Sequence, residues 1–176
     1  MLTDKVIYLR ALEPSDIDKI FEWENNVELW NAGSTIAPFS RQQIIQYLKD
    51  YSSDIYTQRQ IRFMVCLCKN DEPIGMFDIF DFDPHNSRAA LGVMIDTASQ
   101  RMGYGYRALA LIERYAFSII NIHQLTAIVS SDNIASINLF KKSHFTLIGE
   151  IEDWLHTPNG YVSSLMFQKI NNASSG

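Results

Sequence analysis

The sequence predicts an α+β domain built on one mostly antiparallel sheet with helices packed against it. Three strand-like runs between residues 62 and 95 are joined by short polar turns, which is typical of an antiparallel meander. A long pattern of helical spacing follows over 106–120, and two strand-like runs close the chain around the turn Pro158-Asn159-Gly160. Strands and helices do not alternate regularly, so the pattern differs from that of a parallel βαβ sheet.

The N-terminal third carries one strand signal and two helix signals. Residues 6–9 form a short strand-like run, and Pro14 then fits the first position of a helix with regularly spaced apolar residues. The sequence Ser40-Arg41-Gln42-Gln43 matches a capping box, which predicts a second helix from Arg41 to Tyr51. The segment 31–39 contains a glycine and a proline and is expected to be a loop.

The rest of the chain predicts six strands and two helices, the long one over 106–120 and a shorter one. The strands are expected over 62–68, 74–82, 89–95, 125–129, 145–154 and 161–168. Asp132 or Asn133 is placed to cap the shorter helix, over 134–142. We expect a single domain over residues 1–170 and a small polar tail, 171–176, that is disordered.

Composition and charge narrow the function classes. A hydrophobic content of 47% with 20% charged residues is typical of a soluble globular protein. The net charge of −5 argues against nucleic-acid binding and suits a cationic or neutral substrate. The chain shows no signal-peptide pattern and no apolar run of transmembrane length, so we expect a cytoplasmic protein without a membrane partner.

Cysteine and histidine positions do not predict a metal site. Cys66 and Cys68 alternate along a strand-like run, so both are expected to point to one face as reduced core residues. Two cysteines cannot supply four zinc ligands, and the four histidines lack ligand spacing. No metal is therefore expected.

The loop over 100–105 carries the clearest signal for a ligand. It ends in two glycines and opens the long helix, where backbone N–H groups are free and the helix dipole is positive. Glycine lets the backbone approach a ligand closely, so a phosphate fits here. Gly103-x-Gly105-x-x-Ala108 also matches a dinucleotide fingerprint, with Asp132 in range for a ribose. However, residues 96–102 separate the first glycine from its strand, and no further βαβ units follow.

A longer phosphate-binding loop, Gln/Arg-x-x-Gly-x-Gly/Ala, is the better match, and other segments support it. They are Tyr8-Leu9-Arg10-Ala11-Leu12, Pro73-Ile74-Gly75, Asp132-Asn133-x-Ala135-Ser136 and Phe140-Lys141-Lys142-Ser143-His144-Phe145. From Asp4 to Lys169 the chain resembles the Gcn5-related N-acetyltransferases (GNAT), and within them the branch of ribosomal-protein and spermidine acetyltransferases. The resemblance implies a central mixed, mostly antiparallel sheet flanked by helices, in which two strands splay apart to form the cofactor cleft. It also implies acetyl-CoA as cofactor and an amine that attacks it directly in a ternary complex.

The resemblance assigns cofactor-binding roles to particular residues. The pantetheine arm pairs with the strand before the loop, where a backbone N–H also polarises the thioester carbonyl. The loop backbone holds the pyrophosphate with added charge from Arg101, and the side chain of Asn133 meets the pantetheine amides; the alternative for Asn133 is a helix cap only. The residues so implied are Val93, Met94, Ile95, Gln100, Arg101, Met102, Gly103, Tyr104, Gly105, Tyr106, Asn133, Ser136 and Phe140.

The sequence departs from the family at both proton-transfer positions. Phe140 stands where relatives commonly have the tyrosine that protonates the thiolate, and Ala90 where they often have a glutamate base. A thiol with a pKa of about 8.5 is a tolerable leaving group, and water or Tyr104 could supply the proton. His144 replaces the glycine that usually ends the preceding helix, so we expect backbone strain there rather than catalysis.

Asp78 and Asp81 are the candidates for base or substrate binding, because an ammonium acceptor must lose a proton before it attacks. Strict alternation places Asp78 on one face of its strand and Asp81 and Asp83 on the other, unless a bulge intervenes. The alternative is that these are solvated carboxylates at a strand end, and Asp83 before Pro84 fits a turn.

Three functions are consistent with these residues. The first is an N-acetyltransferase acting on a polyamine, another small amine or a protein N-terminus. The sequence is also consistent with a homo-oligomer. The second is a catalytically weak acetyl-CoA-binding regulatory module, and the third a dinucleotide-dependent oxidoreductase.

Overall fold

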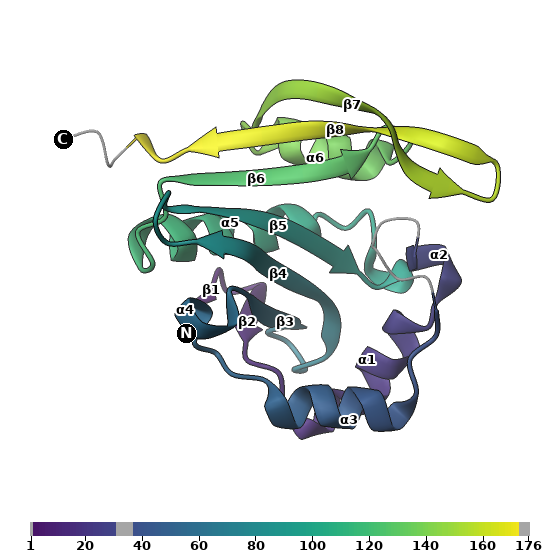
Figure 1. Cartoon of the computed structure of the whole chain (residues 1–176). Coiled ribbons are helices and arrows are strands. Elements are labelled where there is room, and N and C mark those ends of the chain that lie inside the picture. Colours follow the sequence, from purple (N-terminus) through teal and green to yellow (C-terminus); the bar gives the residue numbers. More distant parts are fainter. Residues whose placement is uncertain (1, 31–36, 173–176) are drawn as a thin grey trace.

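Eight strands form one sheet in the computed structural model, which describes residues 2–30 and 37–172. The strands are β1 (Leu2–Thr3), β2 (Ile7–Arg10), β3 (Ile61–Leu67), β4 (Pro73–Asp83), β5 (Arg88–Ile95), β6 (Gln124–Ser130), β7 (Thr146–Thr157) and β8 (Gly160–Ile170). Their order is β1-β2-β3-β4-β5-β6-β8-β7 (Figure 1). Only β5 and β6 pair in parallel, so the predicted mostly antiparallel α+β sheet is confirmed.

The helices follow local signals in the sequence. They are α1 (Ile17–Glu24), α2 (Val27–Trp30), α3 (Arg41–Asp50), α4 (Ile55–Gln58), α5 (Tyr104–Ser118) and α6 (Ile134–Lys142), with 3₁₀ turns at Pro14–Asp16 and Thr97–Ser99. The predicted capping box of α3 is present, since the Gln43 N–H donates to Ser40 Oγ at 3.2 Å and the Ser40 N–H to Gln43 Oε1 at 2.7 Å. The helix predicted over 134–142 matches α6 at both ends.

Two predictions are wrong at particular residues. Strand β3 ends at Leu67, so Cys68 lies in a turn and is exposed, whereas Cys66 is buried as predicted. Asn171 was assigned to the disordered tail but is 7% exposed, and its N–H donates to the His123 carbonyl at 2.7 Å. The predicted loop at 31–39 falls largely outside the described residues, as does the tail from 173.

The central strands of the sheet are buried on both faces. On one face, α5 and α6 cover residues that include Phe77, Leu91 and Leu125. On the other, α1 and α3 cover a smaller cluster that includes Met64 and Met76. Because side chains alternate along a strand, β5 contributes to both clusters, and its C-terminal end lies between the two helical layers.

Candidate cofactor and acceptor site

Strands β5 and β6 pair only near their N-terminal ends and then diverge. Their parallel pairing covers only Arg88–Gln124, Ala89–Leu125 and Ala90–Thr126, although β5 continues to Ile95 and β6 to Ser130. Beyond that point β6 stays paired with β8 up to Ser130, and Figure 1 shows β5 and β6 diverging. The splayed strand pair implied by the resemblance is therefore present.

The diverging edge of β5 presents backbone groups at alternate residues. The Asp96 N–H donates to the Ile74 carbonyl at 2.8 Å, which shows which residues of this antiparallel ladder direct their peptide groups toward β4. By alternation, Val93 and Ile95 direct their peptide groups away from β4, whereas Met94 directs its groups toward β4. The Ile95 carbonyl accepts from Gln100 Nε2 at 2.9 Å, which agrees with this phase. Val93 thus offers an N–H and a C=O at the splayed edge.

The loop after β5 is shaped by left-handed backbone at Arg101 (φ 61°) and Gly103 (φ 80°). Helix α5 starts at Tyr104, and the Arg107 N–H, which donates to the Gly103 carbonyl at 3.2 Å, closes its first turn. The preceding N–H groups therefore point out of the helix start. Gly103 has no heavy atom within 4 Å of where a Cβ would stand, so the backbone is open to a ligand at this point. The geometry fits a pyrophosphate.

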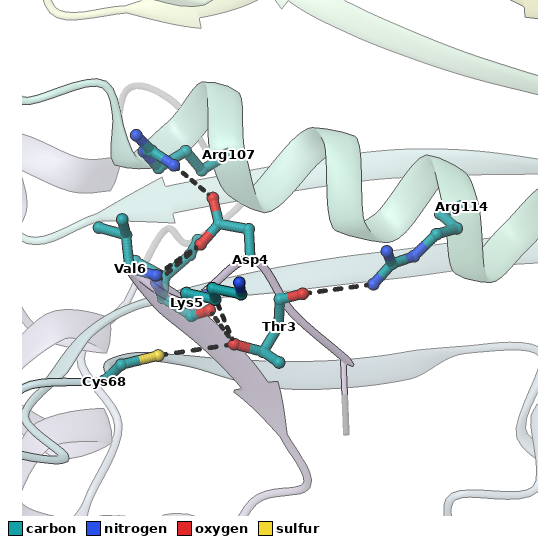
Figure 2. Close-up of polar contacts among 8 residues, drawn as sticks. Thr3, Asp4, Lys5, Val6, Cys68, Arg107 and Arg114 are labelled. Atoms are coloured by element: carbon teal, nitrogen blue, oxygen red, sulfur yellow. Dashed lines mark hydrogen bonds and ion pairs between the residues drawn. The ribbon is translucent and has the colours of Figure 1, made fainter.

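The start of α5 is anchored to the first two strands (Figure 2). Arg107 Nη1 lies 2.6 Å from Asp4 Oδ2, and Asp4 Oδ1 accepts from the Ile7 N–H at 2.9 Å. Arg114 Nη2 donates to the Thr3 carbonyl at 3.5 Å. Partial burial raises the pKa of Asp4, but the hydrogen bonds to backbone N–H groups and Arg107 outweigh it and lower the pKa overall. These contacts fix the loop-bearing end of the helix against the sheet.

Two residues of the family motif in α6 have clear structural roles. Asn133 Oδ1 accepts from the Ser136 N–H at 3.0 Å, so Asn133 caps the helix, and its amide nitrogen takes no part in that bond. Phe140 is 2% exposed, and its ring lies 5.1 Å from that of Phe145 and 5.9 Å from that of Phe167. The position that usually holds an acid is therefore a core aromatic ring.

A charged network lies on the α1/α3 side of the sheet. Arg62 donates from Nε to Asp78 Oδ1 at 2.6 Å and from Nη2 to Asp78 Oδ2 at 2.9 Å, and from Nη1 to Glu24 Oε1 at 2.8 Å. Tyr47 contacts the guanidinium with its ring, and the Tyr51 hydroxyl accepts from the Arg62 N–H at 2.7 Å. Burial lowers the pKa of Arg62, but the neighbouring carboxylates, Asp78 first, raise it by more, so the pKa of the guanidinium lies above its usual value.

Sequence reasoning found Asp78 but missed its partners. Arg62 lies on β3, 16 residues before Asp78 in the sequence. Glu24 lies on α1, 38 residues before Arg62. An arginine inside an otherwise apolar strand was the available signal, because buried arginine requires a partner.

A bulge in β4 contains Asp81 and is followed by Asp83. The register with β5 shifts between Phe80 and Asp83, and Asp81 is exposed with φ of 50°. The bulge breaks strict alternation, as the prediction allowed. Asp83 accepts from the N–H groups of His85 and Asn86 at 3.1 Å each, and its bonds to Asn86 lower its pKa to about 2. The turn assignment of Asp83 is confirmed.

His144 has φ of 62°, which confirms the expected left-handed strain. Trp23 is 3% exposed in the core, and Trp154 is 53% exposed on β7. The described residues contain no group of three His, Cys, Asp or Glu side chains that could hold a metal ion. No helix within 2–30 and 37–172 is long and apolar enough to span a membrane.

Comparisons with known proteins agree with this geometry. Residues 7–146 match the acetyltransferase (GNAT) domain family. The chain is 25% identical over 146 residues to spermidine N(1)-acetyltransferase of Escherichia coli K12, covering 82% of this chain and 75% of that protein. It is 22% identical over 145 residues to the acetyltransferase PseH of Campylobacter jejuni, covering 82% and 86%.

Solved structures show the same fold. A Vibrio cholerae spermidine N-acetyltransferase in complex with CoA and spermine superposes with a TM-score of 0.86 at 20% identity, over 96% of this chain and 97% of that one. A dodecameric structure of the Vibrio cholerae enzyme gives a TM-score of 0.80 at 20% identity, over 98% and 100%.

Proposed function

The chain belongs to the GNAT acetyltransferase family and is an acetyl-CoA-dependent acyltransferase, and we propose that its acceptor is a polyamine or another small cationic amine. The spermidine acetyltransferases among its relatives support this acceptor class, as does the charged network beside β5. One observation carries the donor half of the proposal: pairing of β5 with β6 ends at Ala90–Thr126, one short strand segment before the phosphate-binding loop.

Val93 and the loop would hold the donor. When bound, acetyl-CoA supplies a thioester whose carbonyl carbon is open to attack by an amine. The Val93 N–H at the splayed edge would donate to the carbonyl oxygen as its charge grows, and a preorganised donor of this kind favours the transition state. The backbone from Gln100 to Gly105 would bind the pyrophosphate, with Arg101 adding charge.

Asp78 would position the acceptor, and Asp81 is the better candidate for the base. Both Asp78 oxygens are held by Arg62, so this carboxylate is fixed in place and its charge is shared. Asp78 and Glu24 place two carboxylates against Arg62, and acidic side chains of this kind favour a cationic amine. Asp81 is exposed and so remains open to an acceptor proton. Because Phe140 cannot donate, we propose that the thiolate leaves with a proton from water or Tyr104.

The proposal also covers the oligomeric state and the cellular location of the protein. The dodecameric relative supports a homo-oligomer for this chain as well. The cytoplasmic location stays a prediction.

An acceptor screen tests the function. The protein would be incubated with acetyl-CoA and spermidine, spermine, putrescine, amino sugars or N-terminal peptides, and release of the CoA thiol would be followed. We expect turnover with the small cationic amines, the polyamines above all, and little with the peptides. Turnover with peptides alone would contradict the polyamine assignment.

The alternative is a regulatory module that binds acetyl-CoA without efficient transfer, and the missing side chains at Ala90 and Phe140 favour it. Calorimetry with CoA separates the two functions. Tight binding of CoA without acetylation of any acceptor in the screen would establish the regulatory module.

A further inference from the structure

Gly92 lies in the middle of β5, where a glycine weakens a strand. Its φ is outside the left-handed region that favours glycine. A Cβ added at Gly92 would stand 3.5 Å from Phe80 Cε1 and 3.7 Å from Asp78 Cβ, which are ordinary van der Waals distances. The fold therefore does not require a glycine at residue 92.

Two other strand glycines have the structural reasons that Gly92 lacks. A Cβ at Gly75 would stand 2.2 Å from the Met94 carbonyl oxygen, so the close approach of another backbone excludes a side chain there. Gly149 lies beside a bulge in β7, whereas Gly92 lies in regular register with β4. A glycine within a strand marks a bulge, a bend, or a point where a backbone or a ligand approaches closely. For Gly92 the close approach of a ligand is the reason that fits.

The open side of Gly92 faces a carboxylate and an aromatic ring. Gly92 pairs with Asp78 across β4 and β5, so the two residues share the α1/α3 face of the sheet. Asp78 Oδ2 lies 4.0 Å from the Cβ position of Gly92, and the ring of Phe80 bounds this space on another side. Carboxylates and aromatic rings both attract a protonated amine.

Gly92 also precedes Val93, whose N–H faces the splayed edge of β5. Successive Cα atoms are about 3.8 Å apart, so the bare Cα of Gly92 lies beside the proposed position of the thioester carbonyl. On the α5 side of the strand the neighbouring Leu91 is 4% exposed in the core, whereas Gly92 is partly exposed on the α1/α3 side. The open approach to the carbonyl is therefore from the side on which Gly92 lies.

We propose that the acceptor nitrogen rests over the bare Cα of Gly92, between the Asp78 carboxylate and the Phe80 ring, and that the absence of a side chain at this residue admits the amine. This inference rests on the proposed transfer to a small cationic amine and on the proposed thioester position at Val93. A nonbonded nitrogen rests about 3.5 Å from a carbon atom, so a Cβ at residue 92 would push the amine outward by about 1.5 Å, the length of the added bond.

Gly92→Ala tests the proposal, and Gly149→Ala is the matched control because both glycines lie within strands outside the left-handed region. On both variants and the wild type we would measure the melting temperature, the Kd for CoA, the Kd of the CoA-bound protein for spermidine, and the acetylation of spermidine. Alanine fits the backbone at both positions and restricts the unfolded chain, so neither variant should melt below the wild type. Both should bind CoA as the wild type does, because the proposed donor contacts on β5 are backbone groups.

The two variants should differ toward the amine. A misplacement of about 1 Å can lower the rate about 100-fold, so Gly92→Ala should lose at least about 100-fold in kcat/KM for spermidine. Its Kd for spermidine on the CoA-bound protein should also rise, because the ammonium is moved away from Asp78. Gly149→Ala should match the wild type in both measurements.

Three results would overturn the proposal: acetylation of spermidine by Gly92→Ala at the wild-type rate, a loss of CoA affinity in that variant, or a melting temperature well below that of the wild type. The last two would give this glycine a role in donor binding or in the fold. Failure of the proposed acceptor class would show in the wild type instead, as transfer to peptides alone. Gly92→Ala should then lose transfer to that peptide, and unchanged transfer would again overturn the proposal.

Discussion

Replacing Asp78 with asparagine separates a structural from a catalytic role for this carboxylate. Asparagine keeps one acceptor oxygen but places an NH₂ group against the Arg62 guanidinium, so one charge-assisted hydrogen bond and the ion pair are lost. Breaking a fully buried pair costs about 3–5 kcal/mol. Here the side chains of Arg62 and Asp78 are 23% and 28% exposed, and Glu24 still neutralises Arg62. We therefore expect a loss of about 2 kcal/mol, close to that of one charged hydrogen bond.

Urea denaturation and steady-state kinetics measure the two roles. With a slope of about 2 kcal/mol per molar urea, the unfolding midpoint of Asp78→Asn should fall by about 1 M. If Asp78 positions a cationic acceptor, the KM for polyamines should rise while the pH profile of kcat keeps its shape. Asp81→Asn is the control for stability, because Asp81 is exposed at a positive φ that asparagine also tolerates.

The opposite pattern would refute this reasoning. A variant as stable as the wild type, with kcat reduced and its pH-dependent limb removed, would mean that Asp78 is the base and that its pair with Arg62 contributes little to the fold.

Three further predictions concern the loop, the end of α6 and the first turn. Gly105→Glu should abolish CoA binding in calorimetry while keeping the circular dichroism of the wild type, and Gly149→Glu, on an open part of β7, should bind CoA normally; unchanged affinity in Gly105→Glu would contradict the loop assignment. His144→Gly should raise stability by about 0.5 kcal/mol because it relieves left-handed strain at φ 62°, whereas a lower melting temperature would mean that the side chain contributes more than the strain costs. Because folding lowers the pKa of Asp4 below 3.8, its contribution is present at neutral pH and is lost as the pH falls through the lowered value. Asp4→Asn should therefore melt below the wild type at pH 7, with the difference shrinking as the pH falls below 3.8; a constant difference would exclude the charge as its source.

Local signals explain which parts of this fold were predictable. The capping box at Ser40, the cap at Asn133 and the turn at 158–160 each involve residues within a few positions, so the sequence alone specifies them. The short helix α4 and the strand β1 are too brief to carry a periodic pattern. Each is held partly by distant residues, since the ring of Tyr56 packs on Phe82 and the Thr3 carbonyl accepts from Arg114.

The candidate site divides in the same way. The loop was predictable because glycines at the start of a helix, here Gly103 at the N-cap and Gly105 in the first turn of α5, have few other uses. The network of Glu24, Arg62 and Asp78 was not, because it joins three elements that approach each other only in the folded sheet. The bulge at Asp81 also lay beyond reach, since it belongs to the register between strands and not to either strand alone.

This division suggests why the cofactor is easier to assign than the acceptor. The proposed donor half of the site is made largely of backbone: the unpaired edge of β5, the left-handed loop and the start of α5. Backbone groups survive substitution as long as the fold does, so relatives at about a quarter identity can keep the same thioester geometry. The proposed acceptor half depends on side chains, which a single substitution can remove and which a bulge such as that at Asp81 can expose. Divergence in this family should therefore alter the amine before it alters the acetyl donor, and the structure-guided variants at Asp78 and Asp81 address that variable half.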